Sequence, residues 1–452
     1  MPAFQAPRGM RDLLPPEMAT FDALSAVVQA RALRYGYPRI STPVVEDREV
    51  FLRSAGQTSD VAGKEMYDVQ LHGQGGLALR PEGTAPVTRA YLQHGLYRAP
   101  HPVRLYYCEP MFRGQRPQAL RYRQFWQWGL ENYGVVEAAA DVEIIEFTSA
   151  LFNEVGLADV ELKVNTVGDE ECQPRIKDAL VAYFSRFRDE LDDDCRTRLE
   201  TSPLRIFDCK NPRDREIAAG APKVRDLVCD ADREHFAEVT DGLDRLGVRN
   251  QVDETLVRGL DYYTRTVCEF HLTDPEFRKA DDIAVAAGGR YDGLVRTMGG
   301  PATPGVGIAG GVEVLMAALK QQGVAARGPV DADVYVVSAD PGDGADRIQL
   351  ATPLREAGFS VAVDYSKRQL DKQLESAVKH GAKVAVIRGT PEARGGNVIV
   401  RDLDKKEQRV TRLAAVITEV GRHVPRRPRP RLSPDDHEPG VAGETPFIKD
   451  KV

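Results

Sequence analysis

The sequence predicts an α+β protein with a large antiparallel sheet, flanking helices and a smaller α/β domain toward its C-terminal end. In the first 320 residues, strand-like segments that contain arginine and glycine are separated by helical segments, which favours an antiparallel sheet over a doubly wound fold. After residue 330, strands and helices alternate as they do in a compact α/β domain with a mixed sheet. The length of 452 residues and the 42% hydrophobic content are sufficient for two or three domains with their own cores.

The same patterns predict the domain boundaries. We expect a principal domain at 1–320 with a helical insertion at about 168–247, a linker at 321–330 and a second domain at 331–423. The insertion is strongly charged, and its charged residues are expected to form a solvated face. The tail at 424–452 is rich in proline and charge and is expected to be disordered.

Composition excludes several classes of protein. No apolar run reaches the ~18 residues of a membrane span, and the first residues lack the apolar core of a signal peptide, so we expect a cytoplasmic protein without membrane association. The formal net charge of −7 argues against a general nucleic-acid coat but is compatible with RNA binding through local basic patches.

The cysteines give no sign of a metal site in the sequence. They are widely spaced without a CxxC pair, and the eight histidines form no HxxxH motif or Cys/His cluster. We therefore expect a reducing compartment and no structural metal. The six cysteines are Cys108, Cys172, Cys195, Cys209, Cys229 and Cys268.

The segment at 103–134 is the most informative part of the chain, because an apolar strand runs into an arginine-rich loop and then into a second strand. Alternation along the second strand places Gln127 and Glu131 on one face together with Gly129, which leaves room for a ligand. The alternative is a solvated arginine loop over a half-buried strand. The loop arginines, whose guanidinium groups suit bidentate phosphate binding, are Arg113, Arg116, Arg121 and Arg123.

A second candidate region lies at 77–95, where a strand ends at Arg80 and a helix begins with Thr84 as its expected N-cap. Glu82 stands between the two elements, and side chains at such junctions point toward ligands. Glu82 and Thr84 are therefore candidates for holding an ammonium group. The alternative is that Glu82 only marks a helix start, where acids are generally favoured.

A β-rich segment at 251–270 embeds Arg258 among apolar residues. An arginine in a half-buried strand needs an anion partner, which is either a structural acid or a substrate phosphate. Tyr262 and Tyr263 are suited to lining a pocket for a flat polar ring, although such aromatic pairs also occur in cores. Glycines in the region 288–311 allow the backbone to approach a ligand closely.

Four motifs occur in one order and at compatible spacing: RPEGT, then FR…RYRQF…Q…E, then LVRGLDYY and AGGRYDGL. Together they resemble the histidyl-tRNA synthetases, a family of class II aminoacyl-tRNA synthetases, and the resemblance covers nearly all of 4–422. It implies a class II synthetase-type sheet in a catalytic domain at 1–320 and an anticodon-binding domain at 331–423. It also implies a homodimer.

The resemblance implies roles for the residues that match the motifs. Glu131 and Tyr263 would contact the imidazole of histidine, and Glu82 with Gln127 would bind its ammonium group. A pocket that hydrogen-bonds the imidazole can reject isosteres by ~10⁴-fold or more. The complete histidine pocket would consist of Glu82, Gly83, Thr84, Gln127, Glu131, Tyr262, Tyr263 and Tyr291.

Contacts with ATP and tRNA are also implied by the resemblance. Arg113 would bind the α-phosphate of ATP and the histidine carboxylate, and Arg121 would bind a second phosphate. Arg258 would stabilise charge on the α-phosphate during attack, a role that metal fills in related enzymes. Arg258 and Arg113 are thus the expected catalytic residues, and no side chain is expected to be a metal ligand. Arg116 and Gln118 match loop positions that meet the acceptor end of tRNA.

The chain departs from the family pattern at two positions. Val314 stands where the last conserved helix has an arginine, so a γ-phosphate contact is expected to be missing. Gln115 stands where a glutamate usually meets the adenine. A charge-assisted contact contributes ~1.5–3 kcal/mol, so the loss of one would slow adenylation by about 10- to 100-fold without abolishing it.

The resemblance implies an ATP-dependent ligase that joins L-histidine to tRNA(His) through a histidyl-adenylate, with Mg²⁺. The alternative is a paralogue that binds histidine and regulates another enzyme, as the regulatory subunit of ATP phosphoribosyltransferase does. That subunit lacks the anticodon-binding domain and typically the arginine of LVRGLDYY, and both are present here. A third possibility, a tRNA-binding protein with a weakened active site, is supported only by Val314 and Gln115. Candidate RNA contacts in the second domain, which could equally be ordinary solvated bases, are Arg368, Lys372, Lys379 and Lys383.

Overall fold

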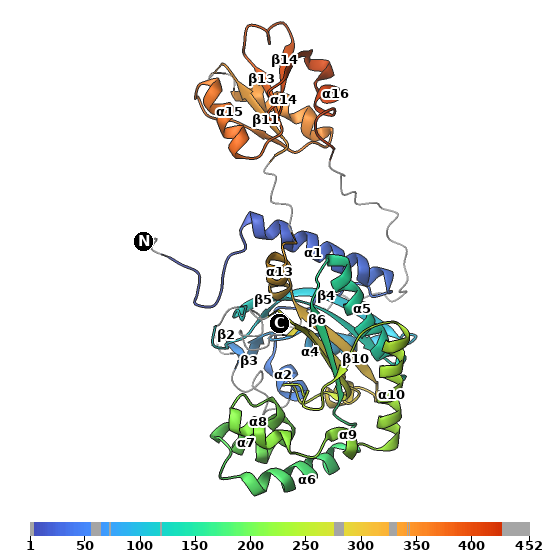
Figure 1. Cartoon of the computed structure of the whole chain (residues 1–452). Coiled ribbons are helices and arrows are strands. Elements are labelled where there is room, and N and C mark those ends of the chain that lie inside the picture. The colour runs from blue at the N-terminus through green and yellow to red at the C-terminus, as the bar shows by residue number, and fades with distance from the viewer. Residues whose placement is uncertain are drawn as a thin grey trace. The chain divides into compact units, whose positions relative to one another are not determined.

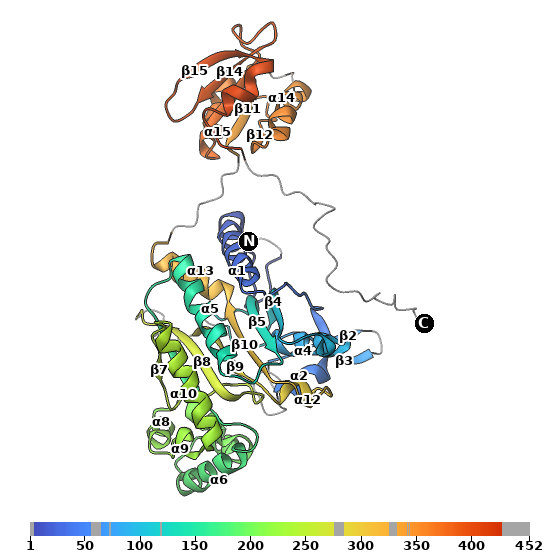
Figure 2. The same cartoon turned by 90° about the vertical axis from the view of Figure 1, so that its right-hand side faces the viewer.

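The computed structural model describes residues 4–55, 65–71, 74–117, 120–274, 284–324, 332–340, 342 and 344–426. The chain divides into two compact units, Met1–Gly328 and Pro329–Val452, and each is described by itself (Figures 1 and 2). Within the described residues, no helix combines the length and the apolar character needed to cross a bilayer.

The first unit is built on a seven-stranded sheet with the strand order β4-β5-β10-β9-β8-β6-β7. All neighbouring strands are antiparallel except β6 and β7, so the predicted antiparallel sheet is confirmed. The strands are β4 (Val103–Phe112), β5 (Gln124–Tyr133), β6 (Val160–Thr166), β7 (Gln251–Val252), β8 (Thr264–Leu272), β9 (Ala284–Arg290) and β10 (Gly305–Gly311).

The predicted hairpin is formed by β4 and β5, which pair in continuous register from Val103 opposite Tyr133 to Phe112 opposite Gln124. Alternation along β5 has the expected effect. Trp128 and Leu130 are fully buried in the main apolar core on one face of the sheet. Hairpin residues on the opposite face, among them Tyr107 and Tyr133, belong to a separate cluster.

Four helices share the main core with the sheet: α1 (Pro15–Arg34), α5 (Ala139–Val155), α10 (Asp230–Arg245) and α13 (Val312–Gln321). Figure 2 shows α1, α5 and α13 on the same side of the strands. The helix α1 begins at two prolines, because the first turn of a helix does not need their missing N–H groups. It packs through Phe21, Leu24 and Val28, which recur at helical spacing.

The opposite face of the sheet carries α4 (Thr84–Gln93) and α12 (Leu294–Thr297), whose apolar residues form a second cluster with tyrosines of the sheet. A small three-stranded sheet with the order β1-β3-β2 precedes α4 in the chain. Its elements and the neighbouring helices are β1 (Val45–Asp47), α2 (Arg48–Ala55), β2 (Tyr67–Leu71), β3 (Gln74–Leu79) and η1 (Leu96–Arg98).

The predicted helical insertion has its own apolar core, made by residues between Cys172 and Val228. The last helix of the expected range, α10, instead packs into the main core through Phe236, Val239 and Leu243. Figure 1 shows the insertion in green at one end of the unit. Its elements are α6 (Gln173–Phe184), η2 (Ser185–Phe187), α7 (Asp193–Thr201), η3 (Pro203–Asp208), α8 (Pro212–Ala219) and α9 (Val224–Leu227).

The expected strand over 251–270 is wrong in its middle part. Only the two residues of β7 pair at its start, and regular pairing resumes with β8 at Thr264. Arg258 therefore lies in an irregular segment between two strands of the sheet. The β-branched and aromatic residues of this segment indicated a strand, but they face a cavity and a packing cluster instead of a neighbouring strand.

The second unit is a five-stranded mixed sheet with the order β12-β11-β13-β14-β15, as predicted for this part of the chain. The strand β11 is parallel to both of its neighbours, and the remaining pairs are antiparallel. The sequence did not indicate β15 or α16. The elements are β11 (Val334–Ser338), α14 (Gly344–Glu356), β12 (Val361–Val363), α15 (Leu370–Lys379), β13 (Val384–Arg388), β14 (Asn397–Asp402), β15 (Gln408–Arg412), η4 (Leu413–Ala415) and α16 (Val416–Val420).

Candidate active site

A cavity of about 680 Å³ opens in the first unit, where β5, β9 and β10 meet the loop before β8 and the helical insertion. Its size is typical of sites for small molecules. Most of the residues that the sequence indicated for a site line this cavity: Glu82, Thr84, Arg113, Arg121, Gln127, Arg258, Tyr262 and Tyr263.

Glu82 stands at the start of α4, where its two carboxylate oxygens accept the backbone N–H groups of Thr84 and Ala85, each at 2.8 Å. The expected N-cap is therefore wrong: Thr84 is the first helical residue and Gly83 precedes it, while Glu82 satisfies the free N–H groups. Burial raises the pKa of Glu82, and these two N–H groups partly offset that effect. Glu82 both caps the helix and faces the cavity, so the two sequence interpretations are compatible.

Glu131 lies behind the cavity wall and is fully buried. Its carboxylate accepts the Thr84 hydroxyl at 2.7 Å, the Tyr107 hydroxyl at 3.4 Å and the Tyr291 hydroxyl. Burial raises the pKa of Glu131 to about 8, although the hydroxyl donors pull it down. Tyr291, another expected site residue, also lies behind the wall and is 1% exposed.

Gly307 is the cavity-lining residue that lies directly against the carboxylate of Glu131. It lines the cavity and pairs with Glu131 across β10 and β5. A Cβ atom at this position would lie 2.1 Å from Oε2 of Glu131. The carboxylate therefore occupies space that is available only because residue 307 is glycine.

Gly83 and Gly129 serve a different purpose from the one expected. A Cβ atom at either position would lie 2.3 Å from the ring of Tyr107, so the ring fills the space that both glycines leave. The expectation that Gly129 leaves room for a ligand is wrong, and Gly83 does not line the cavity. Tyr107, which does line it, was missed in the sequence because it lies within an apolar strand and looks like core.

Gln127 and two tyrosines complete this part of the cavity. The Oε1 atom of Gln127 is buried and has no hydrogen-bond partner among the described residues, so it can accept a donor from a ligand. The rings of Tyr262 and Tyr263 lie 4.7 Å apart, centroid to centroid. The pKa values of both phenols are raised, chiefly by burial, so at neutral pH they are hydroxyl donors.

Three arginines line the cavity: Arg113, Arg121 and Arg258. Arg258 forms an ion pair with Glu269 of β8, which is the structural acid considered as its partner. Burial opposes the charge on Arg258, but Glu269 outweighs this effect and raises its pKa. Burial lowers the pKa of Arg113, and the nearby charge of Arg258 lowers it further. A bound polyanion would offset the repulsion between the guanidinium groups of Arg113 and Arg258.

The remaining residues of the hairpin loop differ in position. Arg116 is exposed and does not line the cavity, and Gln118 lies outside the described residues. Gln115 lines the cavity and donates to the carbonyl of Tyr122 at 3.2 Å. Val314 lines the cavity while packing against the main core, so the expected arginine position does face the site.

Part of the insertion also lines the cavity, which the sequence did not indicate. Its charged residues were expected to form a solvated face, but several of them point to the site. Nothing in the spacing of these residues distinguishes them from surface charge. The insertion residues that line the cavity, charged and uncharged, are Asp192, Asp194, Arg198, Asp208, Cys209, Lys210 and Asn211.

In the second unit, two of the four candidate RNA contacts have acidic partners. Arg368 pairs with Asp364 at 3.1 Å, and Lys372 pairs with Glu375 at 2.8 Å. The side chains of Arg368 and Lys372 are about half exposed, at 52% and 55%. Lys379 and Lys383 are exposed.

An antiparallel sheet that gathers arginines and a buried acidic pocket around one cavity, followed by a mixed α/β domain, defines a class II aminoacyl-tRNA synthetase. Family models identify the type. The model described as histidyl-tRNA synthetase matches residues 9–169 and 200–315, and the model described as anticodon binding domain matches residues 333–423. The chain belongs to the histidyl-tRNA synthetase family.

Individual relatives agree with this assignment. The chain is 43% identical over 419 residues to the histidine–tRNA ligase of Desulforudis audaxviator, which covers 92% of this chain and 98% of that protein. The ligase of Pelotomaculum thermopropionicum is 41% identical over 411 residues, covering 91% and 96%. The crystal structure of apo histidyl-tRNA synthetase from S. aureus matches with a TM-score of 0.78 and 31% identity, covering 92% of this chain and 99% of that one.

A solved structure bears on the regulatory alternative. The chain described as an ATP phosphoribosyltransferase regulatory subunit/histidyl-tRNA synthetase from Bacillus halodurans matches with a TM-score of 0.58 and 22% identity. At this identity the match shows the shared fold alone. The ligase interpretation therefore holds, and the regulatory paralogue is not better supported.

Proposed function

We propose that this chain joins L-histidine to tRNA(His) in two steps. Histidine and ATP first form histidyl-adenylate and pyrophosphate, and the histidyl group then passes to the terminal ribose of the tRNA. One observation carries the proposal: a single cavity combines acceptors suited to an amino acid with arginines suited to phosphate. The acceptors are Glu82 and Gln127, and the arginines are Arg113, Arg121 and Arg258.

The proposed histidine pocket is formed by buried hydrogen-bond acceptors, one of which is unpaired among the described residues. The ammonium group would donate to Gln127, whose Oε1 atom has no partner among the described residues, and to the carboxylate of Glu82. The imidazole would lie against Gly307 and donate an N–H to Glu131, with Tyr263 beside it. Because these groups are buried, an amino acid that cannot hydrogen-bond to them would leave them unpaired at a high cost.

The adenylation step needs positive charge at the α-phosphate. An oxygen of the histidine carboxylate attacks the α-phosphorus, the bond to the bridging oxygen of the β-phosphate breaks, and pyrophosphate leaves with the electron pair. Arg113 and Arg258 are proposed to stabilise the charge that develops, with Glu269 holding Arg258 in place.

ATP is proposed to enter with Mg²⁺. Arg121 lines the cavity, has no ion pair with any described residue and would bind a second phosphate. Glu65 also lines the cavity and provides oxygen ligands of the kind that Mg²⁺ prefers. Bound Mg²⁺ would neutralise part of the triphosphate charge, and most of its other ligands would be phosphate oxygens and water.

The remaining parts of the proposal concern partners. The second unit would bind the anticodon, and Arg116 and Gln118 of the hairpin loop would meet the acceptor end. We also propose a homodimer, a cytoplasmic location, a catalytic domain at 1–320 and a tail at 424–452 that stays outside the fold.

The test is histidine-dependent exchange of pyrophosphate into ATP by the purified chain, with tRNA charging measured alongside. The Arg258→Ala variant should lose exchange by about 10²- to 10³-fold, because it removes one transition-state charge donor. The matched control is Arg34→Ala, a half-exposed arginine paired with Glu154 on the surface. Histidine binding without exchange or charging would overturn the proposal and favour the regulatory paralogue.

A further inference from the structure

Four potential metal ligands from distant positions meet in the helical insertion: Asp192, Cys195, Cys209 and Asp214. Asp192 caps α7, Cys195 lies in the first turn of α7, Cys209 directly follows η3, and Asp214 lies in the first turn of α8. Their ligand atoms all lie within 4.8 Å of one another. Cysteine spacing alone predicted no metal site, because these residues are separated in the sequence and only the fold brings them together.

Two sulfur–oxygen distances in this cluster are close to those of tetrahedral coordination. The Sγ atom of Cys209 lies 3.3 Å from Oδ2 of Asp214 and 3.8 Å from Oδ2 of Asp192. Zinc bonds of about 2.3 Å to sulfur and 2.1 Å to oxygen, at the tetrahedral angle, place the two ligand atoms about 3.6 Å apart. The other oxygen of Asp192 accepts the backbone N–H of Cys195 at 2.7 Å, and Oδ2 has only two long contacts, with the Asn211 amide at 3.5 Å and the Cys209 thiol at 3.8 Å.

The charge in the cluster also calls for a cation. Asp214 and Cys195 are 0% exposed, and Cys209 is 7% exposed. In the described part of the chain, every hydrogen-bond donor to the two carboxylates is uncharged: backbone N–H groups, the Cys209 thiol and the Asn211 amide. A buried carboxylate without a cationic partner is unfavourable unless it binds a metal or a proton.

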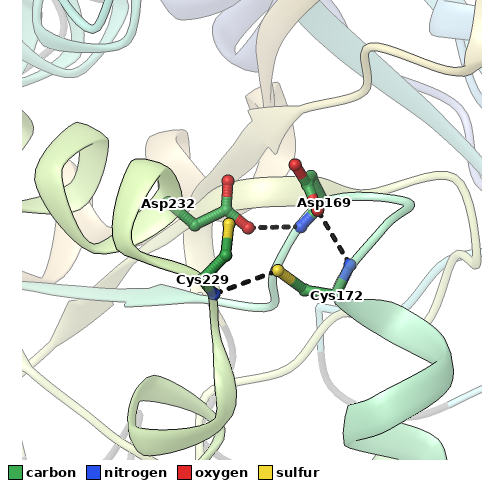
Figure 3. Close-up of side chains that lie close together, drawn as sticks. All are labelled: Asp169, Cys172, Cys229 and Asp232. Atoms are coloured by element: carbon green, nitrogen blue, oxygen red, sulfur yellow. Dashed lines mark hydrogen bonds between the residues drawn. The ribbon is translucent and has the colours of Figure 1, made fainter.

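A second cluster with the same ligand types shows the contrast (Figure 3). It consists of Asp169, Cys172, Cys229 and Asp232. Arg265 donates to Asp232 at 2.8 Å and lies 3.6 Å from Asp169, so the arginine already balances the acids. The sulfur of Cys172 accepts the N–H of Cys229 at 3.1 Å. This cluster therefore needs no metal, and it provides a matched control.

We propose that Asp192, Cys195, Cys209 and Asp214 form a structural site for one Zn²⁺ ion. Two cysteines and two carboxylates suit a borderline-soft divalent cation, and four protein ligands leave no open position for catalysis. The two thiols lose their protons to solvent when the sulfur–zinc bonds form, so no oxidant or reductant is needed.

The ion would join α7, η3 and α8, which are three short elements of the insertion. Asp192 and Cys209 also line the cavity, together with Lys210 and Asn211. The metal would thus hold one wall of the active-site cavity in place.

The test is the zinc content of the full-length chain, purified without chelators or a histidine tag and dialysed against metal-free buffer. We expect one zinc per chain by elemental mass spectrometry. The Cys195→Ser/Cys209→Ser variant should lose it, and the Cys172→Ser/Cys229→Ser variant should keep it. Absence of zinc from a chain that also fails to take up added Zn²⁺, retention in the first variant, or loss only in the second would each overturn the proposal.

X-ray absorption at the zinc edge tests the same site without any substitution. The first shell should contain two sulfur atoms at about 2.3 Å and two oxygen atoms at about 2.0–2.2 Å. Mapping of thiols by mass spectrometry provides a second check on the native chain. Cys195 and Cys209 should be alkylated faster after a strong chelator removes the metal, and a disulfide between them in the purified protein would overturn the proposal.

Discussion

Replacing Glu131 by glutamine tests the proposed histidine pocket at its most buried acceptor. Glutamine has the same shape but no charge, and its amide presents a donor where the carboxylate accepts hydroxyls. In the proposed complex Glu131 is ionised and accepts the imidazole N–H. A hydrogen bond to a charged group contributes about 1.5–3 kcal/mol, so the Kd for histidine should rise by about 10- to 150-fold. The measurement is calorimetric titration with histidine, with Glu143→Gln, whose half-buried carboxylate pairs with Arg104 away from the cavity, as the control.

The same variant should change how stability depends on pH. Burial raises the pKa of Glu131 to about 8 from an ordinary value of 4.5. The stabilisation by the protonated carboxyl is complete below about pH 4.5 and is lost as the pH rises through 8. In the native chain this residue lowers the free energy of unfolding by about 1.4 kcal/mol per pH unit between pH 5 and 8, whereas the glutamine variant lacks this contribution.

Urea unfolding at several pH values measures that difference. Both tryptophans of the chain, Trp126 and Trp128, lie in β5, so their fluorescence reports on the first unit alone. A histidine affinity within threefold of the native value would refute the assignment of Glu131 to the pocket. Parallel pH profiles for the two chains would refute the argument that the carboxyl is protonated in the folded, unliganded protein.

Three further substitutions test other parts of the site. Gly307→Ala should abolish detectable histidine binding by calorimetry, because its Cβ atom would lie 2.1 Å from the carboxylate of Glu131 and displace it; binding within tenfold of native would contradict the proposed place of Glu131 in the pocket. Glu269→Gln should lower kcat for pyrophosphate exchange by about 10- to 100-fold with little change in the KM for histidine, because Arg258 loses its anchor; a change confined to KM would argue against a positioning role. Val314→Arg should lower the KM for ATP about tenfold if a γ-phosphate contact is missing, and an unchanged or higher KM would show that the position does not face the triphosphate.

Much of the architecture could be predicted because it depends on local patterns. The hairpin of β4 and β5 follows from residue alternation, and α1 follows from its apolar spacing and its two prolines. The candidate site was also visible, since arginines, a glutamate at a strand-to-helix junction and paired tyrosines are unusual in such positions. These residues also lie in short motifs that occur in one order along the chain, so they could be recognised from the sequence.

Other features could not be predicted, because they depend on which distant segments meet. Arg258 was expected in a strand, since its neighbours are β-branched and aromatic, but a cavity occupies the place of the neighbouring strand. The glycine at 129 looked like room for a ligand, and the ring of Tyr107 fills that room. The charges of the insertion looked like a solvated face, although several line the cavity.

By itself, then, the sequence determined the fold class, the family and most of the residues around the cavity, because helix and strand periods and short motifs are local properties. Only the tertiary structure decided that Glu131 lies behind the wall, that Gly307 leaves room for its carboxylate, and that Cys195 and Cys209 meet two aspartates. The physical reason is that burial, close approach and metal geometry are set by contacts between segments, and no spacing along the chain records those contacts.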